Sequence, residues 1–185
     1  MQATTAMADL SKNTDPVAVV AAMKAHTGVA AVQEHGCWAL INIAFLADNQ
    51  PKVAAAGGIE AVVAAMKAHT GVAIIQEYGC RALANIAVLA VNKPKVAAAG
   101  GIEAVVAAMK AHVSVAIIQE YGCWALLIVA WSAYLKAKVA ALGGLAAADS
   151  AMLFHSGNAA VQTKGTELKA KLQGLVRTPS CVNLT

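Results

Sequence analysis

The sequence predicts an all-α protein built from tandem copies of one 43-residue unit. Its composition favours helices, because hydrophobic residues make up 59% of the chain, aromatic residues only 4%, and there are just four prolines. The tetrapeptide Met-Lys-Ala-His begins at Met23, Met66 and Met109, which are 43 residues apart. Residues 16–58 and 59–101 are identical at 33 of 43 positions. A match of this length identifies repeats that must stack in order to bury their apolar faces.

Each unit divides into three predicted helices. A short first helix covers 94–99 and closes on a Gly-Gly corner, where proline suits the first turn and glycine the left-handed position after the last. The second helix covers 59–69, with apolar residues on one face. The third covers about 72–90. A short helix before two longer ones favours a three-helix repeat over a two-helix repeat.

Two small features recur with the same period. Gly79 lies inside the third helix at a position that is also glycine in the other units, and we expect neighbouring helices to touch closely there. Histidines recur at the ends of the second helices, where they are expected to cap the helix dipole; they are His26, His69, His112 and His155.

The chain is expected to contain about three full repeats and one eroded C-terminal repeat that caps the array. The units cover 16–58, 59–101, 102–144 and 145–176, with tails at 1–15 and 177–185. The exposed end of such an array requires polar residues. In the fourth unit, Glu167 and Lys171 are spaced to form an i, i+4 ion pair.

The segment from Val32 to Ala44 resembles the third-helix signature of armadillo repeats, as found in the importin-α and β-catenin families. The Gly-Gly corner and the second-helix pattern are also similar, so the resemblance covers about 16–176. It implies a right-handed α-α superhelix whose third helices line a concave groove that holds an extended peptide. In that family asparagines bond the ligand backbone and tryptophans pack its side chains, which implies these roles for Asn42, Asn85, Trp38 and Trp124.

Residues at i, i+4 and i+8 lie along one face of a helix and define a candidate binding row. Its members are Glu34, Trp38, Asn42, Glu77, Arg81, Asn85, Glu120 and Trp124. A tryptophan face beside a carboxylate suits a cationic side chain, whereas Arg81 suits an acidic one. The row therefore predicts an extended protein ligand of mixed charge. The alternative is that these residues are ordinary solvated and packing positions.

The third unit is more apolar than its neighbours. Its hydrophobic residues are Trp124, Leu127, Ile128, Val129, Trp131, Tyr134 and Leu135. If this surface is exposed, we expect a partner or a homo-oligomer there. If the fourth unit covers it, it is core. The alternative function is therefore a structural or oligomerising module of a larger assembly.

Other function classes have no support in the sequence. Cys37, Cys80 and Cys123 are expected to be buried and unpaired, no zinc spacing is present, and no catalytic constellation can be assembled. We therefore expect no enzyme activity, no cofactor and no metal. A net charge of +4 without a basic, aromatic-rich run argues against nucleic-acid binding. No membrane insertion is expected, and the N-terminus carries no readable secretory signal, which predicts a cytoplasmic or nuclear protein.

Overall fold

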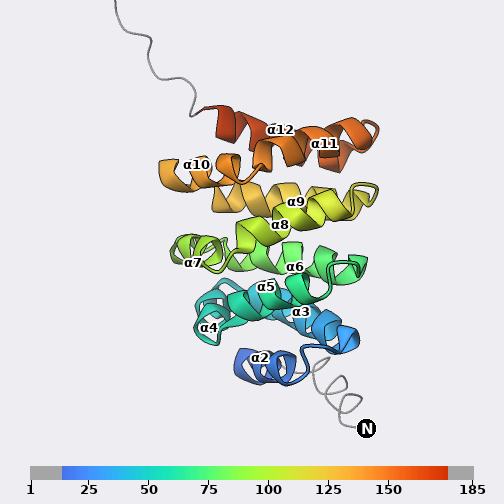
Figure 1. Ribbon diagram of the computed structural model, residues 1–185. Coiled ribbons are helices and arrows are strands. Elements are labelled where there is room, and N and C mark those ends of the chain that lie inside the picture. Colours follow the sequence, from blue (N-terminus) through green and yellow to red (C-terminus); the bar gives the residue numbers. More distant parts are fainter. Residues whose placement is uncertain (1–13, 175–185) are drawn as a thin grey trace, which may run out of the picture.

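The computed structural model describes residues 14–174, and this part of the chain is all-helical (Figure 1). The second helices of the four units are α2 (Pro16–Ala25), α5 (Gly58–Ala68), α8 (Gly101–Ala111) and α11 (Gly144–Phe154). The third helices are α3 (Ala30–Ala44), α6 (Ala73–Ile86), α9 (Ala116–Val129) and α12 (Ala159–Gln173). The short first helices are α4 (Gln50–Ala55), α7 (Lys93–Ala98) and α10 (Ala133–Ala141). Short 3₁₀ turns at Ala47–Asn49 and Ala90–Asn92 lead into α4 and α7.

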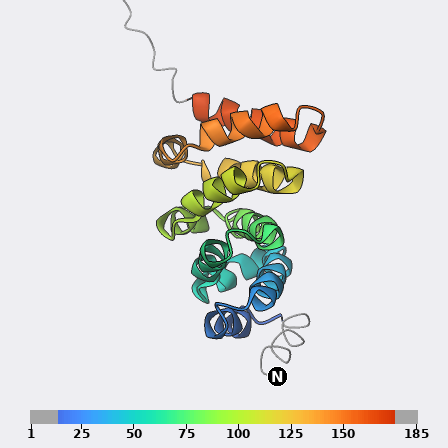
Figure 2. The ribbon, with the colours of Figure 1, turned by 45° about the vertical axis from the view of Figure 1, so that its right-hand side comes forward.

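Consecutive units are stacked in chain order, so that each second helix and each third helix lies beside its counterpart in the next unit (Figures 1 and 2). Helices α3, α6, α9 and α12 contact one another in this order, and α2, α5, α8 and α11 do the same. The second and third helices of one unit also pack together. The third helices therefore form one continuous layer of the molecule and the second helices another. The predicted all-helical repeat packing is confirmed.

The Gly-Gly corners have the predicted conformation. Gly57, Gly100 and Gly143 have φ values of 83°, 83° and 90°, in the left-handed region that suits glycine. The second glycine of each pair begins the next helix, one residue earlier than the sequence predicts. A Cβ at Gly101 would lie 2.8 Å from the Val96 carbonyl oxygen, so this position also requires glycine.

A glutamine joins the second and third helices in each unit, and it is buried in the first three units and half-buried in the fourth. The Gln76 Nε2 donates to the carbonyl oxygens of Met66, at 3.0 Å, and His69, at 2.8 Å. The Met66 carbonyl is in the last turn of α5, where the helix itself provides no donor, whereas the His69 carbonyl also accepts from the Val72 N–H at 3.0 Å. Equivalent pairs of bonds come from Gln33, Gln119 and Gln162.

The close helix contact expected at Gly79 is present. A Cβ on Gly79 would lie 2.4 Å from Met66 Cγ and 2.6 Å from its Sδ. The methionine of the second helix thus occupies the space that a side chain would need. The same arrangement occurs at Gly36, Gly122 and Gly165.

The repeated histidines cap the second helices and also link neighbouring units. Each one is the residue that follows the last helical turn, as predicted. In addition, His69 Nε2 donates to the carbonyl oxygen of Thr27 in the preceding unit, at 2.8 Å. His112 and His155 make the same bond to Thr70 and Val113, at 2.7 and 2.8 Å.

The third helix of the second unit ends earlier than the sequence predicts. It was expected to reach Ala90, but α6 ends at Ile86. Asn92 lies fully buried behind this end, and its Nδ2 donates to the Ile86 carbonyl oxygen at 3.0 Å and to the Gln50 carbonyl oxygen at 3.3 Å. A side chain therefore supplies the hydrogen bond that another helical turn would have made.

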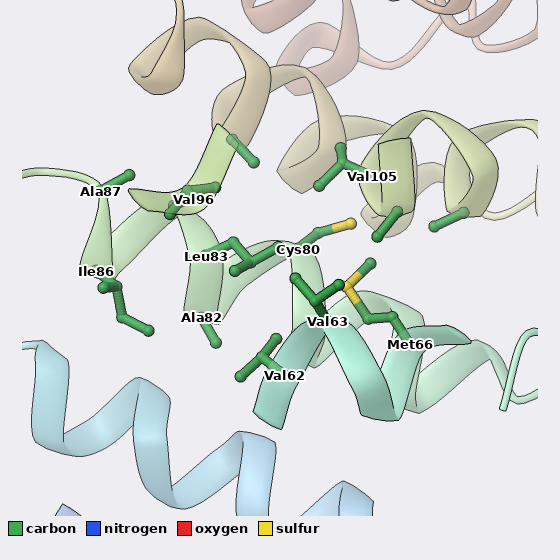
Figure 3. Packing of buried hydrophobic residues seen from close by; sticks show 14 of the residues in the cluster. Val62, Val63, Met66, Cys80, Ala82, Leu83, Ile86, Ala87, Val96 and Val105 are labelled. Carbon is green, nitrogen blue, oxygen red and sulfur yellow. The ribbon is translucent and has the colours of Figure 1, made fainter. Parts of the chain in front are cut away.

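Small aliphatic side chains form the core. In the close-up, Val62, Val63 and Met66 of α5 face Cys80 and Leu83 of α6 (Figure 3). Val96 of α7, and Val105 of α8 in the following unit, extend the same cluster. In the described part of the chain no single helix is long and apolar enough to cross a bilayer, whereas α10 and α11, bent by 63° at their junction, reach that length and hydropathy together.

The fourth unit has a polar outer helix, but its charges pair differently from the prediction. Glu167 pairs with Lys164 at 2.9 Å, so the expected Glu167–Lys171 pair is wrong. The Lys171 ammonium instead donates to the Leu127 carbonyl oxygen at 2.9 Å. Lys169 forms a second ion pair, with Asp149.

Replacing Gly79 with Ala should lower the free energy of unfolding by about 1–3 kcal/mol, because the new methyl group overlaps Met66 in a packed interface. Urea denaturation followed by circular dichroism measures this change. Gly71→Ala is the matched control, since a Cβ at Gly71 would meet nothing within 4 Å. Equal stability of the two variants would contradict the proposed packing role of Gly79.

Candidate functional site

The eight residues of the predicted row lie on the side of the third helices that faces away from the second helices. We call them the third-helix row. Trp38 and Asn42 are exposed, whereas the other six are half-buried. The opposite side of each third helix is buried and carries the glutamine, glycine and cysteine positions. The row is therefore accessible along three adjacent helices.

Arg81 links the row across three units. Its guanidinium carbon lies 5.8 Å from the centre of the Trp38 ring on α3 and 5.4 Å from the Tyr121 ring on α9. Tyr121 in turn packs against Trp124, with ring centroids 6.2 Å apart. Cation–π contacts of this kind hold a guanidinium without using up its N–H donors. Within the described residues Arg81 has no carboxylate close enough to form an ion pair.

A hollow of about 260 Å³ lies at the N-terminal end of the row and is lined by Glu34, His35, Trp38 and Tyr78. The Trp38 and Tyr78 rings are 5.2 Å apart and tilted by 41°. His35 Nδ1 donates to the Ala31 carbonyl oxygen at 2.7 Å, which fixes its ring. The hollow thus combines aromatic faces with a carboxylate, a combination that attracts cationic groups.

Two groups beside the hollow have shifted pKa values. Burial raises the pKa of the Glu77 carboxyl, and the positive charge of Arg81 partly offsets this. The pKa of Tyr78 is raised by burial and by the carboxylates of Glu77 and Glu34, with Arg81 again acting in the opposite direction. The carboxylates of Glu34 and Glu77 thus place negative charge near Tyr78, and Arg81 offsets it only in part.

The two asparagines of the row have different environments. Asn42 is exposed, and its side chain makes no hydrogen bond within the described residues. Asn85 is half-buried, and its Nδ2 donates to the Ile41 carbonyl oxygen of the preceding unit at 3.3 Å. Lys171 makes the equivalent bond to Leu127 in the fourth unit, whereas Ile128 has no donor to make it in the third. The amide of Asn85 therefore contributes to packing between units, and its Oδ1 is left to accept a bond.

The apolar residues of the third unit are divided between core and surface. Val129 and Leu135 are buried, and Trp124, Leu127 and Ile128 are half-buried against the core. Trp131 and Tyr134 are 60% and 72% exposed. The sequence allowed these residues to be either core or exposed surface. The structure shows that some of them are core and that Trp131 and Tyr134 are exposed.

The cysteines have the predicted buried, unpaired state. Cys37, Cys80 and Cys123 are free thiols in the core. Burial raises the pKa of Cys37 and Cys123 to about 12, and that of Cys80 is raised by burial and by Cys123 and Glu77. Among residues 14–174 no group of three or more His, Cys, Asp or Glu side chains is arranged to hold a metal ion.

Sequence reasoning did not assign Tyr78, Tyr121 or His35 to the site. All three occupy the same position of the repeat. In the second unit this is Tyr78, which lies between Glu77 of the row and the packed Gly79. Because i+1 neighbours do not share a helix face within one unit, the row pattern excluded them. The rings of Tyr78 and Tyr121 reach Trp38 and Arg81 in the preceding unit instead, and His35 lines the hollow. The recurrence of an aromatic or imidazole ring at a 43-residue spacing is the signal that could have indicated this.

The comparisons with known proteins establish the fold only. No protein-family model matches the chain, and no curated protein matches its sequence. The chain is similar to a crystal structure of an engineered protein, with a TM-score of 0.71 and 23% sequence identity. The match covers 93% of this chain and 72% of the engineered one. It supports the all-helical architecture.

The buried thiols should not react with Ellman's reagent in the folded protein, because their raised pKa values leave almost no thiolate at neutral pH. The measurement uses a Cys181→Ser variant, since Cys181 lies outside the described residues. Reaction of the remaining thiols is expected only after unfolding in urea. Rapid reaction under native conditions would contradict their burial.

Glu77→Gln should raise the free energy of unfolding at pH 7. The pKa of Glu77 is raised in the folded state, so its ionised form opposes folding at neutral pH, and this penalty disappears as the pH falls through its folded pKa. The gain from the substitution should therefore vanish at low pH. Urea titrations at several pH values measure it.

The control for Glu77→Gln is Glu60→Gln, which removes an exposed carboxylate from the first turn of α5. This change should give no gain, because a negative charge favours that end of the helix. A gain of equal size in both variants would show that general charge reduction, and not the burial of Glu77, causes the effect.

Proposed function

We propose that this protein is a non-catalytic scaffold that binds an extended protein segment along the third-helix row. We further propose that its repeats form an armadillo-type, right-handed superhelix. The three-helix unit with a left-handed Gly-Gly corner supports the second proposal. The first rests on one observation above all, the accessible line of rings and charges that runs from Trp38 through Arg81 to Tyr121 and Trp124.

The geometry of this line suits an extended chain better than a compact ligand. It crosses three stacked helices, α3, α6 and α9, and an extended peptide advances about 3.3 Å per residue, so a short segment would span them. Flat rings separated by polar groups offer contacts to alternate side chains of such a segment. Asn42 adds an exposed amide that can donate to and accept from the peptide backbone.

The charges of the row define the ligand further. Glu34, Trp38 and Tyr78 surround the hollow, where a lysine or arginine side chain would offset the remaining negative charge. Arg81, held between two rings without an ion-pair partner in the described residues, would accept a carboxylate. The preferred segment therefore carries a basic residue for the hollow and, before or after it in sequence, an acidic residue for Arg81.

The double substitution W38A/N42A should weaken binding of such segments about tenfold or more, because it removes the exposed ring beside the hollow and the exposed amide of the row. Peptides selected from a random displayed library against the immobilised protein serve as ligands, and fluorescence anisotropy gives Kd. F154A/T166A is the control, since it changes an exposed ring and an exposed polar residue on the fourth unit.

Selected peptides should be enriched in adjacent basic and acidic residues, and they should shift the NMR signals of α3, α6 and α9. Peptides that bind W38A/N42A as tightly as the unchanged protein, or that shift only signals of the second helices, would contradict the proposed site.

A further inference from the structure

A second surface lies where the third helices end and the chain turns toward the short first helices. Trp131 and Tyr134 are exposed there, between α9 and the first turn of α10. Lys93, at the beginning of α7, places its ammonium 4.8 Å from the centre of the Trp131 ring. We call this surface, made up of Lys93, Trp131, Tyr134, Lys136 and Lys171, the basic aromatic patch.

Three lysines from three different helices converge on this patch. Lys93 belongs to α7, Lys136 to α10 and Lys171 to α12, and α7 and α10 both pack against α9, while α10 also contacts α12. Lys171 donates to the Leu127 carbonyl oxygen near the end of α9 at 2.9 Å. Burial lowers the pKa of Lys171, and the positive charges of Lys93 and Lys136 lower it further. The ammonium groups of Lys93 and Lys136 are therefore each close enough to that of Lys171 to repel it.

No acidic residue of α7, α10 or the turns that precede them balances these charges, and Glu167 of α12 pairs with Lys164. Residues 86–98 and 129–141, which form this edge in the second and third units, contain four lysines and no Asp or Glu. The ion pairs found among the described residues use Lys164 and Lys169, both outside the patch. One lysine would satisfy the end of α9. The other two create a local positive charge that an anionic partner would neutralise.

Apolar side chains continue from the patch along the same edge. Phe45, Val88 and Trp131 occupy one repeat position in successive units, and they are 77%, 51% and 60% exposed. Val91 and Tyr134 form a second such pair, 60% and 72% exposed. Figure 1 shows α4, α7 and α10, the helices that these residues lead into, one above another on the left of the view. The exposed apolar residues thus form a stripe across the units, and the lysines lie at one end of it.

We propose that the basic aromatic patch binds an acidic segment of a partner protein. The apolar side chains of this segment would lie along the stripe. Carboxylates would pair with Lys93 and Lys136, and an aliphatic side chain would cover Trp131 and Tyr134. The patch shares no residue with the third-helix row. The acidic segment is therefore a second ligand, different from the segment proposed to bind the row. A nucleic acid or an anionic membrane would require positive charge along the whole edge. The corresponding residues 43–55 of the first unit contain one lysine, Lys52, and one aspartate, Asp48, so they add no net positive charge to the edge.

Fluorescence anisotropy with a labelled peptide of alternating leucine and glutamate tests the proposal on the full chain. K93A/K136A should weaken binding about tenfold or more, and W131A/Y134A should do the same. K24A/K67A is the control, because it removes two exposed lysines from the second helices α2 and α5 and lowers the net charge equally. Its Kd should stay within about twofold of the unchanged protein.

Peptides with glutamine in place of glutamate, or serine in place of leucine, should bind weakly. Equal weakening by K93A/K136A and K24A/K67A would reduce the effect to net charge and overturn the proposal. Stronger binding to phosphatidylserine vesicles or to single-stranded DNA than to the peptide would also overturn it. A patch-dependent dimer seen by light scattering, with no peptide binding, would assign the surface to a second copy and overturn it too. Substitutions in the third-helix row leave this assay unchanged, so the two proposed surfaces fail or succeed separately.

Discussion

The fold depends on a glutamine amide that donates to two backbone carbonyls at the end of each second helix and is buried in the first three units. A helix that ends inside a protein leaves carbonyl groups without donors, and burying them unsatisfied is unfavourable. The glutamine comes from the third helix, so the bond fixes both the distance between the two helices and the rotation of the third. Gly79 and Met66 make this distance attainable, because the methionine fills the place of the missing side chain.

This constraint determines which side chains of the third helix face outward. Once Gln76, Gly79 and Cys80 are turned toward the second helix, Glu77, Arg81 and Asn85 must lie on the other side. The outward positions take no part in the contact between the second and third helices of a unit. Their side chains can therefore differ from unit to unit. Trp38, Arg81 and Trp124 therefore occupy one repeat position with different chemistry, while the frame beneath them is almost unchanged. Such a division suits a protein whose ligand is selected by surface residues alone.

Local patterns were sufficient to predict the helices, the corners and the buried thiols, because each depends on residues close together in the chain. The left-handed glycines and the close approach at Gly79 follow from what glycine allows. Contacts between units were less predictable. The bond from Asn85 to Ile41 and the stacking of Arg81 on Trp38 join residues from neighbouring units, and their geometry depends on how far each unit is rotated relative to the last. The failed Glu167–Lys171 pair has the same origin, since a carbonyl of α9 offers Lys171 a better partner.

The bonds between units also bear on how arrays of this kind change in length. They join residues 41 to 44 positions apart, as from His69 to Thr27, Asn85 to Ile41 and Lys138 to Ala97. Duplication of one whole 43-residue segment would therefore recreate every joint with its neighbours, whereas insertion of any other length would break several at once. The gene can lengthen the array only in complete units. Each added unit would bring a new third helix, and with it one more outward position at which ligand preference could diverge.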